Sequence, residues 1–293
     1  MADSSKRRIS RESLLFLLPA LTGITLFLFV PICFMIYYSF TDYYLLRPND
    51  KTFIGFDNYI RLSDDPLFYK TLKNTLYFVI FVVPLQTAMS LGLALLVHPK
   101  IKFKRFFTTA FFSPVVMSLV IVGLLFTFLY NPNNGLFNAI FNIFGFEGLK
   151  FLSSPDQAMN SIIVMSVWQG AGYQMIIFLA GLKDIPEQLY EAASIDGASM
   201  WQKFLHITLP GLRNVMIFVL ITITMGAFRL IIQPLVMTQG GPLDSTKTLL
   251  YYMYESGFQF RNLGYGSAIA VVFLLLVLMV TVIQRLALKD DKS

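Results

Sequence analysis

The sequence predicts an all-α polytopic membrane protein with six transmembrane helices and both chain ends in the cytoplasm. Three observations predict it: a composition poor in charge, six long apolar runs, and an uneven distribution of lysine and arginine. Of the 293 residues, 56% are hydrophobic and 14% are charged, whereas a soluble domain carries about 25% charged residues. This composition excludes an ordinary soluble domain and a disordered chain.

Each apolar run is long enough to cross a bilayer as a helix. The hydrocarbon core is about 30 Å thick, and a helix needs roughly 20 apolar residues to cross it. Open sheet edges cannot face lipid, so helices are expected, and the prolines inside the runs are expected to kink them. The six expected spans are residues 13–40, 72–97, 106–130, 160–182, 212–236 and 264–284.

The first run has the positive start of a signal peptide. However, it is far longer than the roughly 7–15 residues of a signal core, and it lacks a small-residue cleavage site at its end. We therefore expect a retained anchor helix. Its basic residues are Lys6, Arg7, Arg8 and Arg11.

The connecting segments differ in basic content. Segments 1–12, 98–105, 183–213 and 285–293 hold 14 Lys and Arg in 60 residues, whereas segments 41–73, 131–159 and 237–263 hold 8 in 89 residues. The positive-inside rule places the first set in the cytoplasm. The net charge of +6 is therefore interpreted as an orientation signal and an attraction to anionic lipid, and no nucleic-acid partner is expected.

Residue patterns typical of enzymes and metal sites are missing. The sequence contains no Gly-x4-Gly-Lys-Ser/Thr loop for ATP phosphates. Its two histidines, His98 and His206, lie in different loops, and its single cysteine, Cys33, lies in a span. Ser267 lacks both nucleophile-elbow spacing and a histidine base within a span. We therefore expect no catalytic site, no metal site and no cofactor in this chain.

The inner loop 183–211 predicts two short helices joined by a glycine turn. Pro186 and Glu187 suit a helix start, Gly197 can end that helix, and residues 198–206 predict a second helix. The first helix could lie on the inner leaflet. Against this, residues 184–196 hold four acids and no Lys or Arg, so an anionic leaflet would repel them. Docking on a cytoplasmic protein is the preferred interpretation.

This loop also carries a recognisable motif. Its residues read Glu191-Ala192-Ala193-x3-Gly197-x9-Ile207-x-Leu209-Pro210. The motif resembles the EAA loop of permease subunits in binding-protein-dependent ABC importers. Further matches resemble the maltose and glycerol-phosphate type of sugar permease: Phe53-x-Gly55-x2-Asn58-Tyr59, Asn74-Thr75, Trp168-x-Gly170-x2-Tyr173 and Gly240-Gly241-Pro242.

The resemblance implies a type I ABC importer permease fold in the cell membrane of a prokaryote. It implies a cytoplasmic tail 1–12, a peripheral first helix 13–40, an outer loop 41–71, a five-helix core 72–284 and a tail 285–293. Implied partners are a second permease subunit in a heterodimer, an ATPase dimer that holds ATP and Mg²⁺, and an extracytoplasmic solute-binding protein. The implied ATPase-coupling residues are Leu189, Tyr190, Glu191, Ala192, Ala193, Asp196 and Gly197.

Five residues are candidates for the solute pathway, because sugars need hydrogen-bonding groups and aromatic faces. They are Trp168, Gln169, Tyr173, Arg229 and Gln233. The aromatic residues could instead belong to an interfacial belt, and Arg229 could snorkel to the outer surface. If it faces the pathway, Arg229 could bind an anionic solute or pair with a carboxylate of the partner chain.

Three functions remain open from the sequence. A carbohydrate importer permease leads, because the flanking matches resemble sugar permeases. An importer permease for another solute, such as glycerol phosphate, is compatible with the EAA loop. A membrane scaffold that docks a protein without transport is the third, and neighbouring genes for a second permease and a binding protein would argue against it.

Overall fold

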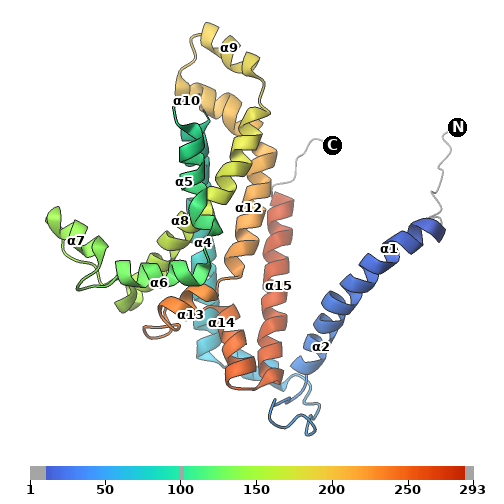
Figure 1. Ribbon diagram of the computed structural model, residues 1–293. Helices are drawn as coiled ribbons and strands as arrows, with labels where there is room; N and C mark the ends of the chain where they lie inside the picture. Colours follow the sequence, from blue (N-terminus) through green and yellow to red (C-terminus); the bar gives the residue numbers. More distant parts are fainter. Residues whose placement is uncertain (1–10, 99–101, 288–293) are drawn as a thin grey trace. The chain divides into compact units, whose positions relative to one another are not determined.

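The computed structural model describes residues 11–98 and 102–287 (Figure 1). Their regular structure is helical apart from two isolated bridges, Thr41 with Phe53 and Tyr44 with Asn262. The described chain divides into two compact units. One runs to Asp64 and takes in Met253–Val272, and the other comprises Asp65–Tyr252 and the described residues from Phe273 onward.

The first unit contains one long apolar helical run. It begins with α1 (Arg11–Ile24), continues through a π-helical turn (Thr25–Phe29) and ends with α2 (Val30–Ser39). The apolar window of this run is 0% buried, as expected for a helix that faces lipid. Beyond it, the short helix α3 (Asp57–Ser63) is tied to the end of α2 by Asn58, whose Nδ2 donates to the carbonyls of Ser39 and Thr41 at 2.9 and 2.8 Å.

The second unit is built around two long helices that pack on each other, α4 (Pro66–Val97) and α8 (Pro155–Lys183). Both begin with proline, which suits this position because the N–H of a first helical residue has no intrahelical acceptor, so its absence costs no hydrogen bond. Asp65 caps α4 by accepting from the Leu67 N–H at 2.9 Å. Helices α5 (Lys104–Val116) and α12 (Arg213–Phe228) pack against this pair. The largest fully buried side chains of the second unit include Phe178, Phe228, Ile162 and Met165.

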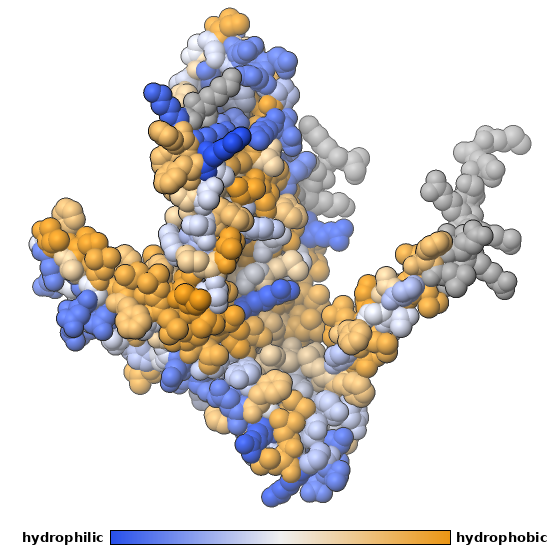
Figure 2. Space-filling view, in the orientation of Figure 1, coloured by the Kyte–Doolittle hydropathy of each residue, from blue (hydrophilic) through white to orange (hydrophobic). Residues whose placement is uncertain are grey.

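Four helices of the described chain are long and apolar enough to cross a membrane, or six if two bent helix pairs each count as one span. The four include α15 (Leu263–Ala287). Figure 2 shows hydrophobic surface over α6 (Leu119–Leu129) and α7 (Leu136–Ile143), where Ile121 and Ile143 are exposed. The exposed apolar surface is consistent with the predicted membrane location.

Two of the expected spans differ from continuous helices. The run 106–130 bends by 99° between α5 and α6, three residues after Pro114, which cannot donate a helical hydrogen bond. The run 212–236 leaves the helix after Phe228 and resumes as α13 (Ile232–Met237). Helix α13 packs on α6 at Gly123, where an added Cβ would be in ordinary van der Waals contact with Met237 and Val236 at 3.4 Å. The first break lies close to a proline, where a kink is expected from the sequence, but apolar counts alone report neither break.

The segment after α13 is tied to the outer end of α4. Asn74 Nδ2 donates to the carbonyls of Asp244 and Lys247 at 2.8 and 2.9 Å. Thr75 Oγ1 accepts from the Leu249 N–H at 2.8 Å, where α14 (Leu249–Tyr254) begins. The polar pair 74–75 therefore orders the turn that follows the Gly-Gly-Pro sequence.

Gly172 allows α5 to pack closely against α8. A Cβ at this position would collide with the carbonyl oxygen of Phe111, whereas a Cβ at Gly92 in α4 would meet nothing within 4 Å. Alanine gains up to about 1 kcal/mol over glycine in an open helix. We expect Gly172→Ala to lower the unfolding temperature of the protein in detergent by several degrees, and Gly92→Ala to leave it unchanged or raised. Equal unfolding temperatures for the two variants would contradict the packing argument.

Candidate coupling loop and solute cavity

The inner loop contains the helix α9 (Glu187–Ile195), which ends in a closed glycine turn. Gly197 has φ +77°, a value that glycine adopts without steric cost. The N–H of Gly197 donates to the Ser194 carbonyl at 3.2 Å, and the N–H of Ala198 donates to the Ala193 carbonyl at 2.8 Å. This pair of bonds is a Schellman motif, so the turn has a defined geometry.

A second helical run follows the turn and leads directly into α12. It comprises α10 (Met200–Lys203), a π-helical turn (Phe204–Thr208) and α11 (Leu209–Gly211), so it is longer than the expected helix 198–206. It begins with a capping box between Ser199 and Gln202. The Tyr190 hydroxyl lies 2.9 Å from Thr208 Oγ1 and joins the two helical runs of the loop.

The predicted coupling residues lie on a projecting, exposed part of the structure (Figure 1). Helix α9 has no buried residue. Of the seven predicted residues, Tyr190 and Ala193 are half-buried, and Leu189, Glu191, Ala192, Asp196 and Gly197 are exposed. Two further apolar side chains that the sequence reasoning omitted, Ile195 and Met200, are 87% and 86% exposed. An acidic helix with exposed apolar side chains suits a protein partner.

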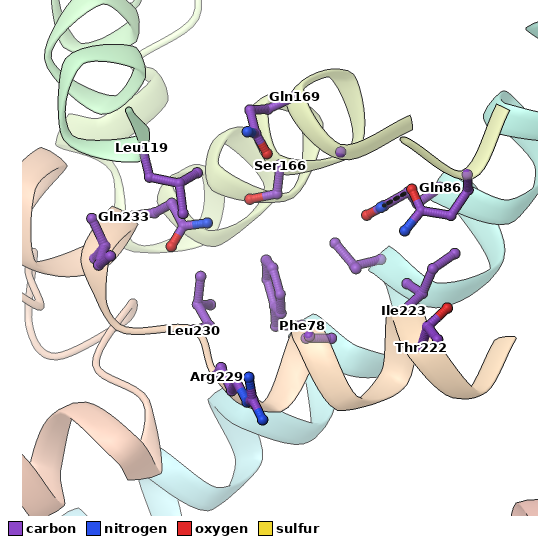
Figure 3. A pocket seen from close by; sticks show the side chains of 16 residues that line it. Phe78, Gln86, Leu119, Ser166, Gln169, Thr222, Ile223, Arg229, Leu230 and Gln233 are labelled. Carbon is purple, nitrogen blue, oxygen red and sulfur yellow. Dashed lines mark hydrogen bonds between the residues drawn. The ribbon is translucent and has the colours of Figure 1, made fainter. Parts of the chain in front are cut away.

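A cavity of about 340 Å³ lies among α4, α8, α12 and the break that follows α12 (Figure 3). Helix α8 lines the cavity with Ser166, Gly170 and Gln174. These residues are spaced four apart and therefore share one helix face. These positions fall near the middle of the 29-residue helix, which places the cavity well inside the expected membrane span. The polar residues that line it are Gln86, Ser166, Gln169, Gln174, Thr222, Arg229 and Gln233.

The structure brings three of the five predicted pathway residues to this cavity: Gln169, Arg229 and Gln233. It does not bring the two aromatic residues there. Trp168 packs on Phe126, with ring centroids 5.2 Å apart, and Tyr173 is about half exposed and is not among the residues that line the cavity. Gln169 therefore lines the cavity without Tyr173, which lies one turn further along α8. A solute role for the two aromatic residues stays a prediction.

Four polar lining residues were missed by the sequence reasoning: Gln86, Ser166, Gln174 and Thr222. Gln86 Nε2 donates to Gln174 Oε1 at 3.0 Å, and this buried pair joins α4 to α8. Ser166 is 8% exposed, and its Oγ has no hydrogen-bond partner. Polar side chains inside apolar spans are themselves a signal of function, and Gln86 and Gln174 could have been found this way.

No group of three or more His, Cys, Asp or Glu side chains in residues 11–98 and 102–287 is placed to hold a metal ion. The arrangement instead offers amide, hydroxyl and guanidinium groups around a partly open space between helices. Such groups form hydrogen bonds with a polar solute, and they show no nucleophile–base pair.

Residues 88–289 match the model of the family described as "Binding-protein-dependent transport system inner membrane component". The chain belongs to this family of ABC importer permeases. The match covers the last part of α4, all of α8 and the inner loop. The permease is thus a multi-pass membrane protein.

Relatives match over nearly the whole permease. It is 38% identical over 284 residues to the "Probable ABC transporter permease protein YurN" of Bacillus subtilis, covering 95% of this chain and 96% of that one. It is 36% identical over 271 residues to the sulfoquinovosyl glycerol transport system permease protein SmoG of Agrobacterium fabrum, covering 92% and 88%. A chain of the crystal structure of a bacterial alginate ABC transporter has the same fold, with a TM-score of 0.80, 24% identity and 97% and 96% coverage.

Proposed function

We propose that this permease is the membrane-spanning subunit of an ATP-driven importer that takes up a carbohydrate delivered by an extracytoplasmic binding protein. The observation that carries the proposal is the cavity among α4, α8 and α12, lined by four glutamines, Ser166 and Thr222. Amide and hydroxyl groups suit the many hydroxyls of a sugar. Relatives named for the transport of sulfoquinovosyl glycerol, arabinooligosaccharides and lactose support the solute class.

The energy for transport comes, in this proposal, from a separate ATPase dimer that binds ATP and Mg²⁺. This chain supplies no ATP hydrolysis and pairs with a second permease subunit in the cytoplasmic membrane of a prokaryote. Its inner loop docks on the ATPase through Leu189, Glu191 and the Gly197 turn. The exposed acidic and apolar surface of α9 supports this role.

The connectivity of the loop provides a path from the ATPase to the solute. The loop follows α8 and leads into α12, and both helices line the cavity. The joints are closely packed: a Cβ at Gly181 would meet Val215 at 2.7 Å, and a Cβ at Gly211 would meet Ile185 at 2.8 Å. Closely packed helices move together rather than deform, so a displacement of α9 would shift the cavity walls.

Reconstitution tests the proposed function directly. The chain is co-expressed with the second permease and ATPase from neighbouring genes, and the complex is placed in proteoliposomes with the cognate binding protein. We expect the three subunit types to co-purify, the binding protein to carry a carbohydrate by mass spectrometry, and that solute to accumulate only with ATP. Failure to retain an ATPase, or a bound solute that is not a carbohydrate, would reject the proposal.

A further inference from the structure

We infer that the carbohydrate handled by this permease bears an acidic group, and that Arg229 is its counter-charge in the cavity. This inference rests on the proposed function and narrows its solute class. Arg229 is the only charged side chain among the residues that line the cavity, and none of them is acidic. The cavity thus has an unbalanced positive charge.

The position of Arg229 is set by its buried neighbours. Phe228 and Leu230 are 2% and 3% exposed, and the Leu230 carbonyl accepts from Thr248 Oγ1 at 2.6 Å. The Arg229 N–H donates to the Gly226 carbonyl at 3.0 Å. The backbone is therefore fixed on both sides, while the guanidinium is exposed at the cavity and forms no ion pair with any described residue.

An isolated charge within a helix bundle is unfavourable unless an opposite charge or hydrogen-bond acceptors accompany it. A guanidinium presents its donors in a planar fork that matches the two oxygens of a carboxylate or sulfonate. An acidic group on the solute would satisfy this charge, whereas a neutral sugar would not. A carboxylate of a partner subunit is the competing explanation.

Ser166 gives a second, independent sign of a ligand. Hydroxyls elsewhere on these helices donate to the carbonyl one turn back, as Ser161 does to Gln157 at 2.9 Å and Thr87 does to Val83 at 2.7 Å. Ser166 Oγ makes no such bond, although it is buried and lines the cavity. In Figure 3, Ser166 extends from α8 and Arg229 lies just after α12, with Phe78 and Leu230 drawn between them. A buried hydroxyl without a partner is costly, so we assign its partner to the solute.

The start of α6 adds hydrogen-bond donors and a partial positive charge near the cavity. Leu119, the first residue of this 11-residue helix, lines the cavity, and Ser118 before it makes no side-chain cap. The first turn of a helix has N–H groups without intrahelical acceptors, and its partial positive charge favours anions. Arg229 and this helix end therefore both favour a negatively charged group in the cavity.

Direct binding of two matched probes tests the inference. The assembled complex of permeases and ATPase, without the binding protein, is equilibrated in detergent with radiolabelled D-glucuronate or D-glucose, which differ only in the group at C6. We expect wild type to retain about tenfold more glucuronate, Arg229→Gln to bind both probes at the glucose level, and Arg229→Lys to keep part of the preference. Ser166→Ala should weaken both probes, and the control Arg105→Gln, a cytoplasmic-side surface change, should behave as wild type.

Three outcomes would overturn the inference. Equal binding of the two sugars to wild type would remove the acidic class and leave carbohydrate import standing. Loss of the second permease from Arg229→Gln on gel filtration, with the glucuronate preference intact, would assign Arg229 to the subunit interface. Binding of neither sugar to a complex that is intact on gel filtration would reject the acidic-sugar inference and count against the proposed carbohydrate function as well.

Discussion

A Gly197→Val permease is expected to lose at least about 90% of ATP-driven solute uptake while remaining folded and inserted. Gly197 has φ +77°, and nothing lies within 4 Å of an added Cβ. The substitution therefore causes no collision, but it places a β-branched residue in the left-handed region, at a cost of about 1–3 kcal/mol. The Schellman turn would open, and α9 would lose its fixed orientation relative to α10. Uptake into proteoliposomes and ATP hydrolysis, measured together, check this result.

Gly145 provides a matched control for the glycine substitution. Its φ is +76°, and it too has nothing within 4 Å of an added Cβ, but it follows α7 on the opposite, predicted extracytoplasmic side. Gly145→Val therefore introduces the same backbone strain away from the loop. We expect it to retain most uptake, with hydrolysis and uptake still in proportion. Equal losses in both variants would show a general folding defect and contradict the coupling role of the loop.

The second large effect is expected when the buried pair Gln86 and Gln174 is replaced singly and together, with thermal stability and solute uptake measured for each variant. Gln174→Leu leaves the Gln86 amide buried without its 3.0 Å partner, and an orphaned buried amide costs about 1–3 kcal/mol. The double variant Gln86→Leu with Gln174→Leu removes both polar groups and is expected to recover near-wild-type thermal stability. Its solute uptake is nevertheless expected to fall at least about tenfold, because two hydrogen-bonding amides of the cavity are gone.

Gln284→Leu is the control for this cycle. Gln284 Nε2 also bonds across helices, to Thr224 Oγ1 at 2.8 Å, but it does not line the cavity. The same change of side chain there should affect stability without a selective loss of uptake. A double glutamine variant that is stable and transports at the wild-type rate would show that the pair is structural only. Thermal unfolding in detergent and initial uptake rates provide the two readouts.

The types of residue and their order along the chain were enough to predict the helical membrane fold, because a span is defined by the length and apolarity of one continuous segment. The prediction located α4, α8 and α15 within a few residues at most ends. The glycine turn at 197 was predicted for the same reason, since its hydrogen bonds join residues at most five positions apart. Family membership followed from the EAA loop and is confirmed by the match over residues 88–289.

Which side chains share the cavity was decided by the tertiary structure alone. Gln169 and Tyr173 lie one helical turn apart as expected, yet only Gln169 lines the cavity, because the part of the helix that meets the cavity depends on how α8 is rotated and placed against α4 and α5. That rotation is set by contacts such as Gly172 against Phe111 and Gln86 against Gln174, which lie about 60 and 88 residues apart in the chain. A single sequence reports the period of a helix and not its rotation toward distant partners. A kink near Pro114 was expected, but the sequence predicted neither the 99° size of that bend nor the break after α12, which bring Leu119 and Arg229 to the cavity.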